Sequence, residues 1–480
     1  MYIIQHFIKI CYNIDDNNHE RGYKCFTYNN DMIYDTIAAK TTADGVSAIN
    51  IIRISGTESI SIVNEIFKGK DLTQQPSHTI HYGHIHDHSQ VIDEVMVSIF
   101  RSPKTFTTED IIEISCHGGN FIADEILKLL ISKGIRIAEK GEFSKRAYLN
   151  GRLDLTEAES IMDLVNAKSF EQLKIANKQL HGDIFTLVTN LQNKILNIIA
   201  QIEVNIDYPE YDDIQQLTND MILPRINDLI TEIKQIIKES ETGKIIREGI
   251  KTVIVGKPNV GKSTLLNTLL KEDKAIVTDI SGTTRDLIEA DLNLDGIILR
   301  LVDTAGIRIT KDVIEKIGIN KTKKAIETAD LVLLVLNQSE GLSEMDKDLL
   351  NLTKNKQRII IGNKIDLGNQ ISIDNESIIN ISAKNKEGIE ELAKAVKQLF
   401  INEKLLNSER AMLSNVRHIG KFKEVLQALN DAKKAALDQI PIDFVEIDLR
   451  KAWANLGEIT GQSSNEDLLD HLFSNFCLGK

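Results

Sequence analysis

Residues 256–263 of this 480-residue chain read Gly256-Lys-Pro-Asn-Val-Gly-Lys-Ser263, and they predict the fold of one part of it. The apolar run Val253–Val255 precedes it, and a helical run, Thr264–Leu270, follows. Between a strand and a helix, the pattern G-x-x-x-x-G-K-[ST] is typical of a loop whose backbone N–H groups surround phosphate oxygens. Lys262 can then reach the β- and γ-phosphates, and the Ser263 hydroxyl can ligate Mg²⁺. The stretch predicts an α/β nucleotide-binding domain.

A second motif, Asp303-Thr-Ala-Gly306, comes directly after the predicted strand Ile297–Val302. In phosphate-loop enzymes such an aspartate holds the metal, usually through water, and the glycine N–H can sense the γ-phosphate. Between the two motifs, Thr284 is the expected further Mg²⁺ ligand, with Thr283 as the alternative.

A third motif, Asn363-Lys-Ile-Asp366, follows the predicted strand Arg358–Ile361. Asp366 can accept hydrogen bonds from N1 and N2 of guanine, whereas adenine offers no matching donors and would leave the carboxylate unpaired. Ser382-Ala-Lys384 ends the next strand, where a backbone N–H can meet guanine O6. The order and spacing of these motifs favour GTP over ATP.

In Ras-type enzymes a glutamine after the D-x-x-G glycine orients the attacking water. The residue at this position is Ile307, which cannot orient water, so another group must do so. Glu315 is a carboxylate that could act on the water, but the residues alone favour a solvated helix position for it.

The periodicity of apolar residues changes along the chain, which predicts a multidomain protein. Short β-rich runs predict a small α+β domain, a change to helical periodicity predicts a bundle, and alternating strands and helices predict a doubly wound parallel sheet. Because segments with helical periodicity flank the α/β part on both sides, we expect that part to be inserted into one helical domain. The expected divisions are an extension over 1–31, the α+β domain over 32–152, helical segments over 153–249 and 401–480, and the nucleotide domain over 250–400.

Two local signals help to define the first helical segment. Thr156 and Glu159 fit a capping box ahead of an apolar face. The stripe from Ile226 to Ile237 falls on one helical face, with Gly243 as a possible stop. The stripes predict a bundle core, and a partner-binding face is the alternative.

Charge, hydropathy and cysteine content argue against several functional classes of protein. With 57 basic and 70 acidic side chains the net charge is −13, so general binding to a phosphate backbone is disfavoured. No stretch approaches 18 uncharged apolar residues, so a membrane span is not expected. Four cysteines without C-x-x-C spacing favour a reducing, cytoplasmic setting. Residues 1–31 fit a frayed extension or a start codon assigned too early, and a targeting arm is the alternative.

Beyond the nucleotide motifs, the chain resembles the MnmE (TrmE) family of tRNA modification GTPases from Met32 to Lys480. The segments that carry the resemblance are Asp35–Ala39, Ile51–Gly56, Glu109–Gly119, Gly141–Ser144, Leu149–Leu155, Thr278–Asp286, Gly457–Gly461 and Phe476-Cys-Leu-Gly-Lys480. The segment Thr41–Ala48 departs from the Pro/Gly/Arg-rich loop usual in relatives.

The resemblance implies a potassium-activated GTP hydrolase that works with an FAD-containing partner, MnmG (GidA). Together the two would add a carboxymethylaminomethyl group to C5 of the wobble uridine of certain tRNAs. A tetrahydrofolate derivative, 5-formyl or 5,10-methylene, would supply the one-carbon unit. The implied assembly is a homodimer through the N-terminal domain and a heterotetramer with MnmG, with tRNA bound largely through the partner.

The resemblance also implies residue roles. Glu315 would orient the water, Ser263 and Thr284 would bind Mg²⁺, and the K⁺ ligands would be Asn259, Thr278, Ile280 and Thr283. With the motifs above, the residues expected to contact GTP are Asn259, Val260, Gly261, Lys262, Ser263, Thr264, Thr278, Thr284, Asp303, Thr304, Ala305, Gly306, Asn363, Lys364, Asp366, Ser382, Ala383 and Lys384.

Folate contacts implied by the resemblance map onto Arg53, Glu113, Arg152 and Lys480. Arginines can grip the anionic glutamate tail of folate, and a carboxylate can accept from pterin donors. Cys477 would lie beside this pocket, either as a catalytic thiol or packed under the tail.

Two alternatives lie outside wobble-uridine chemistry. A ribosome-assembly or RNA-binding GTPase switch usually carries a basic RNA-binding domain, which this acidic chain lacks. A membrane-linked GTPase would need a span. The histidines His78, His81, His84, His86 and His88 could suggest a metal, but no cysteine or carboxylate cage accompanies them, which favours a structural or surface role.

Overall fold

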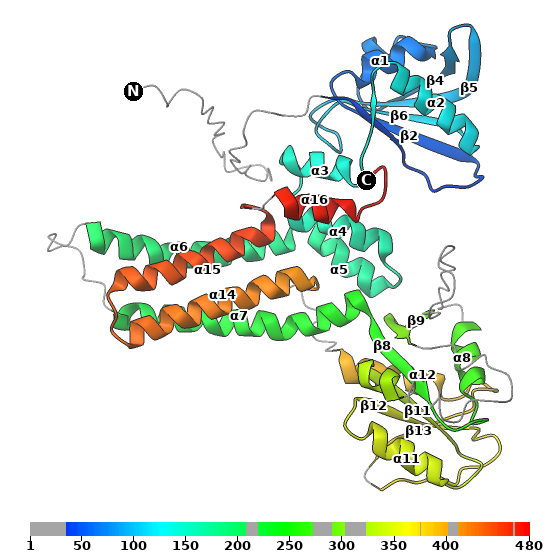
Figure 1. The fold of residues 1–480 in the computed structure, drawn as a ribbon, viewed down its shortest axis with the longest axis vertical. Helices are drawn as coiled ribbons and strands as arrows, with labels where there is room; N and C mark the ends of the chain where they lie inside the picture. Colours follow the sequence, from blue (N-terminus) through cyan, green and yellow to red (C-terminus); the bar gives the residue numbers. More distant parts are fainter. Residues whose placement is uncertain are drawn as a thin grey trace. The chain divides into compact units, whose positions relative to one another are not determined.

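The computed structural model describes residues 35–207, 219–271, 290–302, 323–374, 376–401, 411–463 and 466–480 (Figure 1). Contacts divide the chain into two compact units. The first ends at Met162 and also contains Gly457–Lys480, and the second is Asp163–Leu456. The unit boundaries cross helices α4 (Leu155–Asn166) and α15 (Ile442–Thr460). The domain boundaries expected from sequence stay predictions.

The first unit is built on a seven-stranded sheet of order β3-β4-β5-β6-β2-β1-β7. All neighbouring strands are antiparallel except β1 and β7, which are parallel. The strands are β1 (Ile37–Lys40), β2 (Ile49–Ser55), β3 (Phe67–Lys68), β4 (Thr79–Asp87), β5 (Gln90–Phe100), β6 (Ile111–His117) and β7 (Arg136–Ile137).

One face of this sheet is covered and the other is largely open. Helices α1 (Ser59–Ile66) and α2 (Asn120–Ser132) pack their buried isoleucines and leucines on the covered face. The open face follows from the alternation of side chains along a strand. On it, Ile80, Tyr82 and Met96 are exposed, and Tyr82 pairs with Met96 across β4 and β5.

In the described residues, the first unit also contains α3 (Glu142–Leu149), the start of α4, the end of α15, and α16 (Glu466–Ser474). Their shared core includes Tyr148, whose hydroxyl donates to the Gly461 carbonyl at 2.8 Å. Helix α16 contacts α3 within this unit.

The expected cap of α4 was wrong by two residues. The Asp154 carboxylate accepts from the N–H groups of Thr156 and Glu157, and the Glu157 carboxylate accepts from the Asp154 N–H. Asp154 and Glu157 therefore form the capping box in place of Thr156 and Glu159, because they stand at the N-cap and N3 positions.

The second unit combines long helices with a second sheet. Helices α6 (Asp183–Asp207), α7 (Asn219–Glu248), α14 (Val416–Leu437) and α15 run alongside one another, and α5 (Phe170–Leu180) leads into them (Figure 1). The expected stop at Gly243 was wrong, because α7 continues to Glu248. A Cβ on Gly243 would lie 2.2 Å from the Leu413 carbonyl oxygen, so close packing of the helix on that backbone accounts for the glycine.

The second sheet has the order β13-β12-β11-β8-β10-β9 and is parallel except at β9–β10. The expected parallel α/β part is confirmed. Its elements are β8 (Ile250–Val255), α8 (Lys262–Lys271), β9 (Ala290–Leu294), β10 (Ile297–Leu301), β11 (Leu331–Asn337), α11 (Glu344–Thr353), β12 (Arg358–Asn363), β13 (Ile378–Ile381) and α12 (Ile389–Phe400).

Strand β11 is buried along its whole length, as its unbroken apolar run predicts for a sheet covered on both faces. Alternate residues belong to separate cores, Leu331, Leu333 and Val335 with α8 and α12, and Val332, Leu334 and Leu336 with α11.

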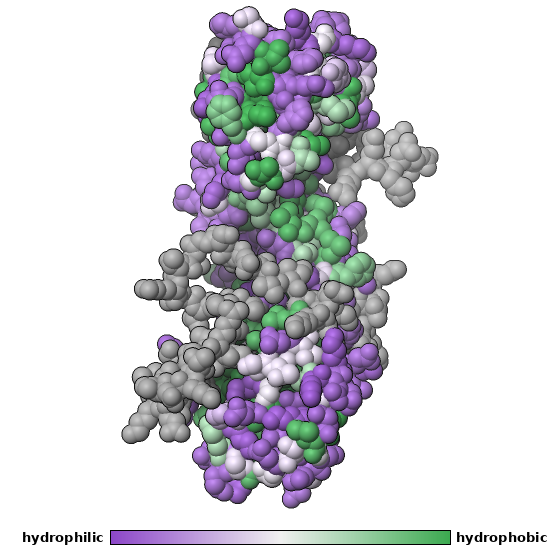
Figure 2. All heavy atoms as spheres, turned by 90° about the vertical axis from the view of Figure 1, so that its right-hand side faces the viewer, coloured by the Kyte–Doolittle hydropathy of each residue, from purple (hydrophilic) through white to green (hydrophobic). Residues whose placement is uncertain are grey.

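The surface is mixed. Figure 2 shows hydrophilic residues over most of the visible face, with hydrophobic residues in separate groups. Among the described residues, no helix combines the length and apolar character that crossing a bilayer requires.

Candidate functional site

The loop after β8 is shaped by close backbone contacts. Asn259 and Gly261 adopt left-handed φ values of 64° and 99°. A Cβ at Gly256 would lie 2.3 Å from the Val335 carbonyl oxygen, and one at Gly261 would lie 2.2 Å from Nδ2 of Asn363. Only glycine fits at these two positions, so the loop can turn tightly between strand and helix.

Lys262 begins α8 and folds back over this loop. Its Nζ donates to the carbonyl oxygens of Gly256 at 2.7 Å and Lys257 at 2.8 Å. Partial burial lowers the pKa of the Lys262 ammonium below its usual value, because the loop displaces water from the charge. Ser263 and Thr264 are exposed at the start of α8, where a metal or phosphate can reach them.

Asn363 joins the loop after β8 to the loop after β13, which was predicted to contact the base. Its Nδ2 donates to the Val260 carbonyl at 2.8 Å, and its Oδ1 accepts from the Ala383 N–H at 3.0 Å. Thr268 of α8 donates its hydroxyl to the Ala383 carbonyl at 2.7 Å. Sequence reasoning did not identify Thr268, because a threonine inside a helix carries no local signal for this contact.

Asp366 lies beside the third loop. Its Oδ1 accepts from the Ser382 hydroxyl at 2.7 Å, which holds the carboxylate at the carboxyl ends of β12 and β13. The structure thus brings together the motifs that begin at Gly256, Asn363 and Ser382. Expected site residues outside the described part are Thr278, Ile280, Thr283, Thr284, Asp303, Thr304, Ala305, Gly306 and Glu315.

The first unit contains a second cluster of expected site residues. Arg53 and Glu113 are opposite each other on β2 and β6, and Arg53 Nε donates to Glu113 Oε1 at 2.9 Å. The Arg53 guanidinium also lies 5.5 Å from the ring centre of Phe106, and that of Arg152 lies 4.9 Å from the same ring. The structure therefore gathers both arginines at one aromatic ring.

The tail of the chain reaches the same cluster. Arg53 Nη1 donates to the Gly479 carbonyl at 3.4 Å, and the Lys480 N–H donates to the Cys477 carbonyl at 3.2 Å. Cys477 is exposed, so the alternative that it packs under the tail was wrong. In contrast, Cys116 is buried, and burial raises the pKa of its thiol to about 11.

The histidine-rich segment lies on and beside β4. His81 is buried and its Nε2 is 2.8 Å from the Thr79 hydroxyl, whereas His84 and His86 stack edge to face. In the described parts of the chain, no three or more His, Cys, Asp or Glu side chains are grouped to hold a metal.

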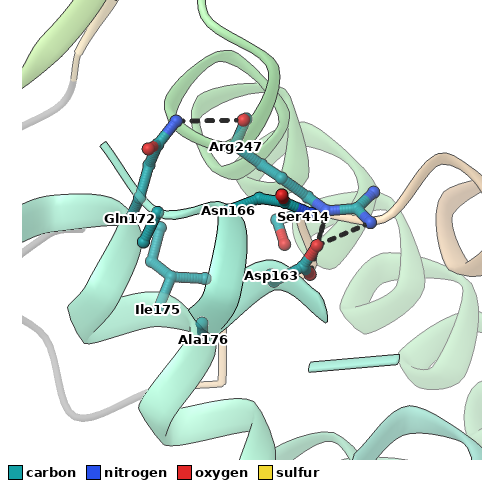
Figure 3. A pocket seen from close by; sticks show the side chains of 8 residues that line it. Asp163, Asn166, Gln172, Ile175, Ala176, Arg247 and Ser414 are labelled. Atoms are coloured by element: carbon teal, nitrogen blue, oxygen red, sulfur yellow. Dashed lines mark hydrogen bonds and ion pairs between the residues drawn. The ribbon is translucent and has the colours of Figure 1, made fainter. Parts of the chain in front are cut away.

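A separate cavity of about 50 Å³ lies among α4, α5, α7 and Ser414 (Figure 3). Arg247 pairs with Asp163 at 2.9 Å, and Gln172 Nε2 donates to the Arg247 carbonyl at 3.1 Å. Ligand pockets measure about 300–1,000 Å³, so this space suits ordered water rather than a nucleotide or folate.

The loops that begin at Gly256, Asn363 and Ser382, together on a parallel sheet, define a P-loop GTPase. The family model described as "GTP-binding protein TrmE N-terminus" matches residues 36–152 of this chain. The model described as "MnmE helical domain" matches residues 155–477. The chain belongs to the MnmE family of tRNA modification GTPases, and it is a GTP hydrolase of tRNA modification.

Three relatives support this membership, each named tRNA modification GTPase MnmE. The protein of Bacillus mycoides (strain KBAB4) is 49% identical over 458 residues, which are 94% of this chain and 100% of that protein. That of Streptococcus thermophilus (strain CNRZ 1066) is 49% identical over 450 residues, 93% and 99% of the two chains. That of Levilactobacillus brevis is 50% identical over 457 residues, which are 93% of this chain and 98% of that protein.

Proposed function

We propose that this GTPase is activated by potassium and acts with MnmG on the wobble uridine of certain tRNAs. The observation that carries the proposal is the pairing, in one chain, of a guanine-nucleotide site with the Arg53–Glu113 cluster. The first would drive a hydrolysis cycle, and the second would hold a carrier of one-carbon units.

In the nucleotide site, Lys262 would contact the β- and γ-phosphates and Asp366 would select guanine. Mg²⁺, on Ser263 and Thr284, would neutralise phosphate charge. A K⁺ ion would supply the charge of an arginine finger, and the exposed loop residue Asn259 fits as one ligand. The other proposed ligands are Thr278, Ile280 and Thr283, and Glu315 would orient the attacking water.

In the first unit, Arg53 and Arg152 would bind the anionic tail of a 5-formyl- or 5,10-methylene-tetrahydrofolate. The residues fit such a ligand, because two guanidinium groups and the Phe106 ring offer both charge and an aromatic face. Glu113 would accept from pterin donors, and Lys480 would add a cation. The catalytic role proposed for Cys477 requires an accessible thiol, and its exposure is compatible with that role.

The open sheet face of the first unit supports the proposed homodimer, because it exposes Ile80, Met96 and the aromatic ring of Tyr82, which a second copy could cover. FAD would be carried by MnmG alone, in a heterotetramer that also supplies most of the tRNA contacts. We place this assembly in the cytoplasm.

Mass spectrometry of tRNA nucleosides from cells that lack this protein tests the proposal. We expect the modified wobble uridine to disappear and to return with the wild-type gene, but not with Lys262→Ala or Arg53→Ala. Unchanged nucleosides in the deletion strain would contradict the proposal and favour a GTPase switch without modification chemistry.

A further inference from the structure

Lys257, the second residue of the phosphate loop, is held by two carboxylates. Its Nζ lies 3.1 Å from Glu340 Oε2 and 3.2 Å from Asp346 Oδ2. The Glu340 side chain is 59% exposed, whereas that of Asp346 is 1% exposed. The hydrogen bonds with Glu340 and then with Asp346 raise the pKa of Lys257, so the side chain remains a cation. The pair with Asp346 is the one shielded from water.

Asp346 has more than a capping role at the start of α11. Its Oδ2 accepts from the Ser343 N–H at 3.0 Å and from the Ser343 hydroxyl at 2.6 Å. Its Oδ1 is buried and makes no hydrogen bond with the described residues. A cap needs only a hydrogen-bond acceptor, but a buried carboxylate charge also needs a nearby cation. Lys257 provides that cation.

The backbone of Lys257 links this ion pair to Lys262, the proposed phosphate ligand. Lys262 Nζ donates to the carbonyl oxygens of Gly256 and Lys257. These two acceptors begin the loop, and Gly256 is packed against the backbone of β11. Anchoring the Lys257 side chain to α11 therefore also restrains the carbonyl groups that set the position of the Lys262 ammonium.

We propose that Lys257 is a positioning residue for GTP hydrolysis. Held by Asp346, it fixes the first peptide groups of the phosphate loop and thereby places the Lys262 ammonium at the β- and γ-phosphates. This inference rests on the GTPase activity and on the proposed contact of Lys262 with the phosphates, and it is independent of the proposed potassium and folate roles.

The test uses the full chain and compares Lys257→Met, Lys257→Arg and wild type. Calorimetry gives GTP and GDP affinities, and initial rates give kcat and KM. Since GTP contacts Lys262 through two phosphates and GDP through one, Lys257→Met should weaken GTP binding about tenfold and GDP binding less, and should lower kcat. Lys257→Arg retains the positive charge and should keep the GTP-to-GDP affinity ratio within about twofold of wild type.

Two controls separate positioning from stability. Lys347→Met removes an exposed lysine of α11, the helix that carries Asp346. Ser343→Ala removes the hydroxyl that caps α11 but leaves the Lys257–Asp346 ion pair. Both should keep the wild-type affinity ratio. A wild-type ratio in folded Lys257→Met, or an equal loss of the ratio in Ser343→Ala, overturns the proposal. Should Lys257→Met fail to fold, Lys257→Gln, which keeps a donor but removes the charge, is measured against the same two outcomes.

Discussion

Asn363 donates to the Val260 carbonyl and accepts from the Ala383 N–H, so one buried amide connects the phosphate loop with the loop that follows β13. In the proposed site, the phosphate and the base of the nucleotide would therefore be recognised by loops that share a side chain. Movement of either loop would strain the same pair of hydrogen bonds.

We expect Asn363→Ala to weaken GTP binding and to lower the stability of the second unit. The substitution leaves the Val260 carbonyl and the Ala383 N–H buried without a partner, at a cost of about 1–3 kcal/mol for each group. Calorimetric melting and titration with a fluorescent GTP analogue measure the two effects. Asn351→Ala, at an exposed position of α11, is the matched control. Wild-type melting and affinity in Asn363→Ala would show that the bridge is dispensable.

Arg53→Ala should weaken the binding of 5-formyl-tetrahydrofolate by about tenfold or more, because a charge-assisted hydrogen bond to the folate tail is lost. Isothermal calorimetry measures the affinity. Lys128→Ala removes an exposed cation of the same unit and should bind folate as wild type does. Wild-type affinity in Arg53→Ala would exclude this residue from the pocket.

Replacing Na⁺ by K⁺ at constant ionic strength should raise the GTPase rate at least about tenfold, since the ion would supply charge that an arginine finger supplies elsewhere. Phosphate release in matched chloride salts measures the rate. Rates that agree in the two salts would rule out the potassium role and leave the GTPase assignment intact.

Glu315→Ala should reduce kcat by at least about 100-fold while GTP affinity stays nearly unchanged, because a group that acts on the attacking water contributes to the transition state. Single-turnover hydrolysis and equilibrium titration separate the two quantities. Glu344→Ala, at an exposed glutamate, should hydrolyse GTP normally. Unchanged turnover in Glu315→Ala would assign the water to another residue.

At pH 8, iodoacetamide should label Cys477 and spare Cys116 in the folded protein. Cys477 is exposed, whereas burial raises the pKa of Cys116 to about 11, so little of its thiolate is present. Peptide mass spectrometry measures the labelling of each cysteine, and denaturant should expose Cys116. Equal labelling of the two cysteines before denaturation would contradict the described burial.

Local sequence signals predicted much of the second unit. The unbroken apolar run of β11 indicates burial on both faces, and the glycine-rich loop after β8 indicates a tight turn between a strand and a helix. Both signals come from neighbouring residues. The nucleotide motifs predicted which loops converge for the same reason.

Contacts between distant parts of the chain could not be predicted in this way. Gly243 resembles a helix stop until the Leu413 backbone is seen beside it. The pairing of Lys257 with Asp346, and that of Thr268 with Ala383, join residues whose spacing carries no periodic signal. Likewise, acidic residues on both sides of Thr156 left the choice of cap to the three-dimensional geometry.

Helix α7 and strand β8 are separated by Gly249 alone, so the long helix and the sheet strand that leads to the phosphate loop are almost continuous. With 30 residues, α7 is about 45 Å long at 1.5 Å per residue. If it moved as a rigid body about Gly249, such a helix would act as a lever. Turning the strand by about 10° would carry the remote end of a rigid 45 Å rod through about 8 Å.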